Sequence, residues 1–271
     1  MRALLTSPLG LLIGVSLGAL GGGGSILAVP ALVYAAGQTP EHATTTSLVL
    51  VAITALLGIV PHWRANRVRF GAGTLFGVVG IAGSLLGSRW NQAANPRLLL
   101  LAFAALMFVA AAAMWRRTRR PAPPVPARSL SAAAAAPAPP ALALHLDVAA
   151  VLRVAVAGTV VGFLTGFFGV GGGFVIVPAL VFALGFTMPD AIGTSLLVIT
   201  INSLVALSTR LQTGSVEWGT VIPFTLASLV GVVIGTRLAR TRDSTSLQRW
   251  FVVLLVAVAT YTAVRSGLAL L

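Results

Sequence analysis

The sequence GALGGGGSILAVPALV occupies residues 18–33, and the similar sequence GFFGVGGGFVIVPALV follows 148 positions later, at residues 166–181. Each lies inside a long apolar segment, 9–36 and 151–185. Glycine costs ~1 kcal/mol relative to alanine within a helix, so a run of glycines breaks the helix. At membrane depth, backbone freed in this way must face protein or a water-filled cavity. Two broken helices at matching positions are typical of the binding sites of secondary transporters.

The composition is that of an integral membrane protein. Of the 271 residues, 57% are hydrophobic and only 8% are charged, and the mean hydropathy is +0.98. Soluble domains carry about three times that share of charged residues. The N-terminal apolar run continues past Pro8 without a cleavage site, so we expect it to be the first membrane element and not a signal peptide.

The charged residues exclude several classes of function. All 18 basic residues are arginine, and the net charge is +13. The arginines lie between apolar segments and form no stripe with interleaved aromatic residues, so we expect no nucleic-acid partner. Cysteine is absent and the three histidines are scattered, which predicts no metal site. No nucleophile–base pair occurs, so we expect no catalytic residues, no cofactor and no enzyme.

The order of apolar and polar stretches predicts an all-α polytopic membrane protein with about eight transmembrane segments. Residues 1–120 hold the first four segments, 121–147 form an Ala/Pro-rich linker, and 148–271 hold the other four. The linker has no periodicity and is expected to be flexible. The expected segments are 9–36, 43–61, 70–88, 96–115, 151–185, 191–209, 218–235 and 248–268.

Several landmarks recur at the same offset of 148 positions, which predicts two homologous four-segment repeats within one membrane domain. The first segment of each repeat is broken at a glycine run and is either a kinked, tilted span or a re-entrant hairpin. The matching landmarks are the two glycine runs, Pro30 and Pro178, Thr46-Ser47-Leu48 and Thr194-Ser195-Leu196, and Gly83-x-x-x-Gly87 and Gly231-x-x-x-Gly235.

Arginine counting predicts the orientation in the membrane. With eight simple spans, 12 of the 18 arginines share the face of the linker; with re-entrant first segments the halves are inverted and the number is 13. A difference of one arginine leaves parallel and inverted halves open. Both arrangements place the linker in the cytoplasm and the multi-pass chain in the cell inner (plasma) membrane.

The glycine runs are the candidate substrate-binding site. Backbone N–H groups freed from a helix form an anion-binding concavity, and the short helix after each run directs its positive N-terminal end to the same place. The alternative is close helix packing around a kink, and the nearby hydroxyls either donate to an anion or cap helices. The candidate residues are Gly21, Gly22, Gly23, Gly24, Ser25, Thr46, Ser47, Gly169, Gly171, Gly172, Gly173, Thr194, Ser195 and Asn202.

Titratable residues support an anion as the substrate. None of the acidic residues, Glu41, Asp147, Asp190, Glu217 and Asp243, lies in an expected span. This argues against a cation pathway and against a carboxylate proton relay. A histidine at position 62 begins a basic loop, where the second half carries arginine. We expect this histidine to be solvated, with a proton relay as the alternative.

These motifs resemble the TauE/SafE family, the sulfite exporter and sulfonate permease group of membrane transporters. The family pattern is a glycine-rich run followed by Val-Pro, then a Thr-Ser-Leu element, a short turn and a G-x-x-x-G helix, all occurring twice. The turn is GSVEW at 214–218, whereas NRVRF at 66–70 lacks the glycine and the acid–Trp pair. The resemblance implies an inner-membrane transporter of sulfite, sulfonates or related small anions, and does not fix the direction of transport.

We therefore expect a secondary transporter of a small anion, either sulfite, a sulfonate or a related sulfur oxyanion, bound between the two glycine runs. A passive anion channel, a transporter of another small organic anion and a non-transporting scaffold are the alternatives. The chain has no ATP-binding motif, so coupling would use a gradient. The expected partners are the anionic substrate and the lipid bilayer, and the oligomeric state stays open.

Overall fold

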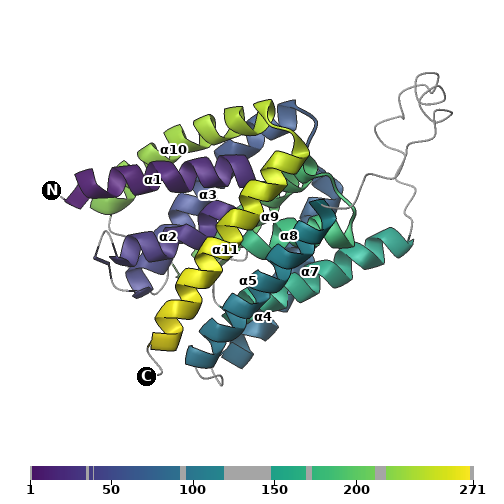
Figure 1. Ribbon diagram of the computed structural model, residues 1–271, viewed down its shortest axis with the longest axis horizontal. Coiled ribbons are helices and arrows are strands. Elements are labelled where there is room, and N and C mark those ends of the chain that lie inside the picture. Colours follow the sequence, from purple (N-terminus) through teal and green to yellow (C-terminus); the bar gives the residue numbers. More distant parts are fainter. Residues whose placement is uncertain are drawn as a thin grey trace.

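The computed structural model describes most of the chain. The described residues are 2–34, 37–38, 40–91, 96–118, 148–168, 173–210 and 218–268, and among them there is no strand (Figure 1). The expected linker and the glycines at 169, 171 and 172 lie outside these ranges. The helices are α1 (Arg2–Leu20), α2 (Gly23–Tyr34), α3 (Pro40–Arg64), α4 (Phe70–Asn91), α5 (Pro96–Thr118), α7 (Val148–Phe168), α8 (Gly173–Ala183), α9 (Met188–Arg210), α10 (Trp218–Thr241) and α11 (Ser244–Leu268).

Many of these helices match the thickness of a membrane. A helix needs about 20 apolar residues to cross a hydrocarbon core of about 30 Å. Six stretches within the described residues meet this requirement by length and composition, which is consistent with the expected all-helical, multi-pass membrane protein. They are Thr45–Arg64, Phe70–Trp90, Val148–Phe168, Met188–Ser208, Val221–Thr241 and Ser244–Val264.

The first glycine run folds the chain back on itself. Gly21, between α1 and α2, has a φ of 70°, a left-handed conformation that glycine adopts without strain. Gly24 then lies against the carbonyl of Ile13 and against Leu17. In a straight helix Ile13 and Gly24 would be about 16 Å apart. Helix α2 therefore runs back beside α1 (Figure 1), and residues 2–34 form a hairpin and not a kinked span.

The ends of α2 and α8 are built in the same way. Each helix is followed by a glycine with positive φ, 66° at Gly37 and 67° at Gly185. In each case a backbone bond closes the turn, from Gln38 N to a carbonyl of α2 at 3.2 Å and from Phe186 N to a carbonyl of α8 at 3.1 Å. Glycine in the left-handed region is the common way to end a helix. These two ends lie at positions 148 apart.

Two helix pairs pack with their backbones in contact. Helix α1 lies along α10, and α7 lies along α4, with glycines at every fourth position facing carbonyls of the partner helix. Such spacing lets two helices approach closely within a membrane. In both pairs the residue numbers rise together, so the paired helices run parallel. The facing residues are Gly10–Phe224, Gly14–Ser228 and Gly18–Val232 in the first pair, and Gly158–Phe76, Gly162–Gly80 and Gly166–Ser84 in the second.

Helices α3 and α9 run antiparallel. Gly58 on α3 lies against the side chain of Leu196 on α9. Four residues later on α3, His62 packs against Gly193, which is three residues earlier on α9. Rising numbers on α3 therefore match falling numbers on α9. These helices occupy equivalent places in the two halves of the sequence, and yet they point in opposite directions.

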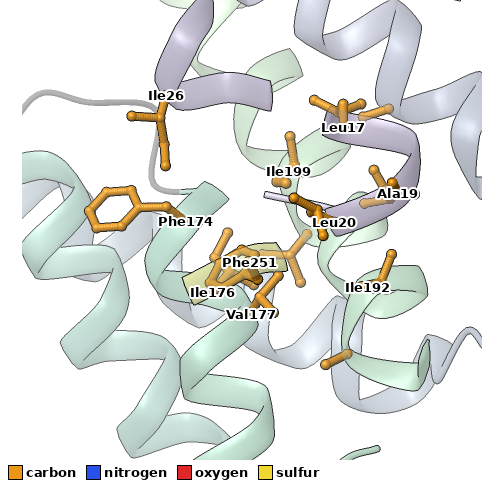
Figure 2. Packing of buried hydrophobic residues seen from close by; sticks show 14 of the residues in the cluster. Leu17, Ala19, Leu20, Ile26, Phe174, Ile176, Val177, Ile192, Ile199 and Phe251 are labelled. Atoms are coloured by element: carbon orange, nitrogen blue, oxygen red, sulfur yellow. The ribbon is translucent and has the colours of Figure 1, made fainter. Parts of the chain in front are cut away.

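An apolar core joins the helix ends that surround the first glycine turn. Figure 2 shows Leu20 at the end of α1 close to Phe251, Ile176 and Val177, with Ile26 and Phe174 on the other side of the turn. All of these side chains are at most 5% exposed. The core therefore fixes the hairpin against α8 and α11, and it excludes water from the sides of the turn.

Candidate functional site

The first glycine turn touches the start of α8. A Cβ on Gly22 would overlap the carbonyl of Gly173, and a Cβ on Gly173 would lie 3.0 Å from the carbonyl oxygen of Gly22 and against the hydroxyl of Ser25. Gly22 directly precedes α2, and Gly173 is the first residue of α8. The structure thus brings together the N-terminal ends of two short helices from the two halves of the chain.

Two helix N-termini at one place favour a negative charge. The first N–H groups of a helix have no acceptor within that helix, and they carry a partial positive charge. Helix α2 has 12 residues and α8 has 11, so each contributes such groups. The amide of Gly21 is committed elsewhere, because it donates to the carbonyl of Leu17 at 2.9 Å and so ends α1. The amides that remain for a ligand are those of the first turns of α2 and α8.

Two of the predicted hydroxyls lie beside the turn. Ser25 Oγ donates to the carbonyl of Gly22 at 2.8 Å, and Ser195 Oγ donates to the carbonyl of Ile192 at 2.8 Å. Ser195 Oγ also faces Gly21 so closely that a Cβ on that glycine would overlap it. Ser25 and Ser195 are 7% and 0% exposed. Both hydroxyls bond to backbone here, and their oxygens lie at the meeting point of the two halves.

The remaining hydroxyls have different surroundings. Thr194 Oγ1 accepts a hydrogen bond from Arg69 N at 3.1 Å, so this residue fastens the α3–α4 connection to α9. Thr46, at the matching position of α3, is 1% exposed, and its Oγ1 has no hydrogen-bond partner among the described residues. The buried Oδ1 of Asn202 has none either. An unsatisfied buried polar group costs about 1–3 kcal/mol, so Thr46 and Asn202 are the candidates that a polar ligand would satisfy. Ser47 is also buried.

The glycine turn is closed in this conformation. Gly21 to Gly24 are all buried, and direct backbone contact between Gly22 and Gly173 leaves no room for an anion between them. The structure has a separate groove of about 630 Å³ between α7 and α8, lined by aliphatic side chains and Arg153 and by none of the candidate residues. An anion therefore reaches the turn only if the first glycine turn and the start of α8 move apart.

His62 is buried, contrary to the expectation that it is solvated. It is 1% exposed, and its Nε2 lies 3.4 Å from the carbonyl oxygen of Gly18. The end of α3 turns sharply after it, because Asn66 adopts a φ of 60° and Arg67 N donates to the carbonyl of His62 at 3.0 Å. The loop therefore folds over the histidine while α1 and α9 cover its sides. No local sequence signal marks burial that depends on two distant helices.

Another contact joins the two halves at this end of α3. Arg69 forms an ion pair with Asp190 at 3.3 Å, and their side chains are 58% and 17% exposed. Arg69 directly precedes α4, and Asp190 lies in the first turn of α9. A pair this exposed contributes at most about 1 kcal/mol. Its effect is to hold the α3–α4 connection next to the start of α9.

Sequence comparisons place this chain in a known family of proteins. Residues 7–262 match the family model described as "Sulfite exporter TauE/SafE". A protein of Xylella fastidiosa (strain 9a5c), called "Probable membrane transporter protein", is 36% identical over 276 residues, which cover 98% of this chain and 97% of that protein. "Probable membrane transporter protein YunE" of Bacillus subtilis (strain 168) is 25% identical over 245 residues, covering 88% and 87%. No solved structure matches the chain.

Proposed function

The chain belongs to the TauE/SafE family of membrane transporters, and on this basis we propose that it is a secondary transporter of a small anion, namely sulfite, a sulfonate or a related sulfur oxyanion. The observation that carries the proposal is the contact of the α2 and α8 N-termini at Gly22 and Gly173. Helix N-termini are ready-made anion sites. Two of them, supplied by the two halves of the chain, surround one point.

In this proposal the anion takes the place of the direct contact between the hairpins. The first-turn amides of α2, at Gly23 and Gly24, and those of α8 donate to its oxygens, and the hydroxyls of Ser25 and Ser195 turn from their backbone acceptors to the anion. Charge-assisted hydrogen bonds are worth about twice as much as neutral ones. The exchange therefore favours the bound state over the closed contact.

We propose further that the two halves are related by a two-fold axis in the membrane plane. The antiparallel packing of α3 and α9 supports inverted halves over parallel ones. Glycine contacts of the same kind join α1 to α10 and α7 to α4. A two-fold axis that superposes α1 on α7 and α10 on α4 accounts for both pairs. Helices α3, α4, α5, α9, α10 and α11 then cross the inner membrane, while α1–α2 and α7–α8 form hairpins that enter from opposite faces.

This arrangement assigns the hairpins a transport role. Helix α7 is long enough to cross a membrane, but it packs on α4 as α1 packs on α10, so we group it with α8. In this proposal the contact between the first glycine turn and the start of α8 closes the path from both faces. Parting this contact toward one face admits the anion while the other face stays closed, which is alternating access.

A flux measurement on purified protein tests the proposed function. Proteoliposomes are loaded in turn with sulfite, sulfate, thiosulfate, taurine, sulfoacetate, methanesulfonate and a carboxylate. We expect saturable uptake of at least one labelled sulfur anion, accelerated by the same anion on the opposite side. Conductance that rises linearly with concentration and shows no counter-transport would instead establish a channel. Absence of any flux above protein-free liposomes would contradict the proposal.

A further inference from the structure

His62 is a buried titratable side chain for which the proposed transport cycle has no role. His62 lies between α1, which ends at the glycine turn, and α9, which carries Ser195. On one side Nε2 is 3.4 Å from the carbonyl oxygen of Gly18 on α1. On the other side its Cβ packs against Gly193 on α9. Histidine changes its charge near neutral pH more readily than any other side chain.

Both neighbours of His62 adjoin residues of the candidate site. Gly18 is three residues before Gly21, and Gly193 is two residues before Ser195. One helical turn rises about 5 Å, so the ring lies about one turn from the glycine turn along each helix. Charges interact more strongly in a dry protein interior than in water. A positive charge on the ring would therefore act directly on an anion held there.

The other charges around this ring are few. Arg67, from the α3–α4 connection, and Arg240, from α10, are the charged groups that act on it electrostatically. Helix α1 presents the Gly18 carbonyl and α9 presents Gly193, neither of which is charged. Asp190, at the start of α9, is paired with Arg69. Among the described buried side chains, His62 is the only histidine.

The second half carries a different residue at the matching position. Residue 210, which is 148 positions after His62, is arginine. Arginine stays protonated at all physiological pH values. The two halves thus hold a permanent charge in one copy and a switchable charge in the other. Repeated halves that differ in this way suit a transporter in which one half senses protons.

We propose that His62 couples transport to protons, so that one proton binds its imidazole as the anion binds the glycine turn and leaves for water when the anion leaves. This rests on the proposed function, because it needs an anion at that turn. The imidazolium attracts the anion, and the anion stabilises the imidazolium. By thermodynamic reciprocity each then strengthens the binding of the other by the same factor. The chain is therefore a proton–anion symporter.

The test measures anion affinity against pH. Methanesulfonate is the probe, because its own charge is constant between about pH 6 and about pH 8. For wild-type protein in detergent we expect the affinity to rise about 5–150-fold from the higher to the lower pH, the usual range of coupling between two sites. We expect His62→Gln to bind methanesulfonate at both pH values as weakly as the wild type does at the higher pH. His62→Arg, which introduces the arginine found at the matching position of the second half, should bind at both pH values as tightly as the wild type does at the lower pH.

Two controls make the result specific. His42→Gln alters a histidine at the start of the same helix and should keep the wild-type pH dependence. In weakly buffered solution, adding methanesulfonate should make the wild-type sample more alkaline through proton uptake, and this change should be absent in His62→Gln. Thermal unfolding of each variant confirms that it is folded, and His62→Gln suffices if His62→Arg does not fold.

The outcomes separate this inference from the proposed function. Equal pH dependence in wild type and His62→Gln, or wild-type binding that does not change with pH, would overturn the coupling role and leave anion transport intact. If wild-type protein bound none of the sulfur anions at any pH, the proposed function would fail, and the coupling role with it.

Discussion

At Gly21 and Gly22 the chain reverses its direction within two residues, and this is possible because neither position carries a side chain. Gly21 requires the left-handed conformation, and Gly22 touches the backbone of Gly173. Gly23 differs from both, because a Cβ there would come too close only to the tip of the Leu254 side chain, at 2.6 Å, and would make an ordinary contact with Leu20. Adjacent glycines of one run thus have different physical reasons for being glycine.

Alanine substitutions separate these reasons. Gly22→Ala forces the glycine turn away from Gly173 at the start of α8. We therefore expect the protein to lose about 1–3 kcal/mol of stability and to lose transport. Gly23→Ala moves only a flexible side chain, so stability should stay near wild type while a methyl group obstructs the anion and weakens binding roughly tenfold, or about 1.4 kcal/mol. Thermal unfolding and anion affinity are measured on the same samples. Gly71→Ala, with nothing within 4 Å of the added Cβ, is the control. Wild-type affinity in Gly23→Ala would argue that the run serves packing alone.

The threonines at matching positions of α3 and α9 give a second test. Thr194 accepts a hydrogen bond from Arg69 N, so Thr194→Val leaves a partly buried donor unpaired and should cost about 1–3 kcal/mol. Thr46 Oγ1 has no partner among the described residues, so Thr46→Val should leave stability unchanged or raise it. If Thr46 binds the anion, this variant loses affinity while it remains stable. Denaturation and binding isotherms of the two variants decide between the roles, and full affinity in Thr46→Val would remove Thr46 from the site.

Helix pairing is set by which glycines face a carbonyl. Gly162 on α7 and Gly80 on α4 lie opposite each other, but their surroundings are not equal. A Cβ on Gly162 would overlap the carbonyl of Gly80, whereas a Cβ on Gly80 would lie at an ordinary distance of 3.4 Å from the carbonyl oxygen of Gly158. The close approach of these helices therefore depends on one side of the interface more than on the other.

A pair of substitutions in this interface should behave differently. We expect Gly162→Ala to push α7 away from α4 and to lower the free energy of unfolding by about 1–3 kcal/mol, as overpacking does. Gly80→Ala should change it by no more than about 0.5 kcal/mol, as mild substitutions do. Thermal unfolding in detergent measures both. Equal destabilisation by the two variants would mean that the helices do not meet in this register.

Sequence reasoning found the break at the first glycine run but not the direction that the chain takes after it. Four consecutive glycines are costly within a helix, so an interruption in this run could be predicted from residue type alone; the structure places it at Gly21 and Gly22, and α2 begins at Gly23. Whether the chain continues or reverses there depends on Gly24 packing against Ile13, which is a tertiary contact. The spacing of Gly10, Gly14 and Gly18 was a visible signal for close helix packing, and the sequence analysis did not use it.

For the candidate site, the sequence named the stretches to consider but could not specify which of their residues meet. Ser25 and Ser195 lie at the glycine turn, whereas Thr194 accepts a hydrogen bond from the backbone of the α3–α4 connection. Such differences arise from the register of α9 against its neighbours, which no local pattern specifies. Burial of His62 was missed for the same reason, because it results from α1 and α9 covering the end of α3.

At the scale of the whole molecule, the direction of the two halves remains the feature with the widest consequences. The arginine counts for parallel and inverted halves differ by a single residue. The reason is that the loops that lie on different faces in the two arrangements carry almost equal numbers of arginines. The antiparallel α3–α9 contact supplies independent support for inversion. Inverted halves would place both termini on the face opposite the linker. Eight simple spans would instead place the two termini and the linker on the same face.

Reporter fusions test this topology. A phosphatase that is active only in the periplasm is fused after Pro124, in the linker, and after Leu271, at the C-terminus. We expect the first fusion to be silent because the arginine-rich face stays in the cytoplasm, and the second to be active. A cytoplasmic reporter at the same two points should give the opposite result. Silence of the phosphatase at Leu271 would favour parallel halves, and activity at Pro124 would reverse the orientation.

The central claim is that the anion binds where the glycine turn of the first half meets α8. Because the chain has no cysteine, single cysteines can report on this place through their rate of reaction with a thiol reagent. We predict that a transported anion at about ten times its Kd slows the labelling of Ser25→Cys and of Ser195→Cys roughly tenfold by mass action. It should leave Ser88→Cys, on the exposed side of α4, unchanged. The contradicting result would be an anion that binds to these same samples and yet leaves the labelling rates of both buried cysteines unchanged.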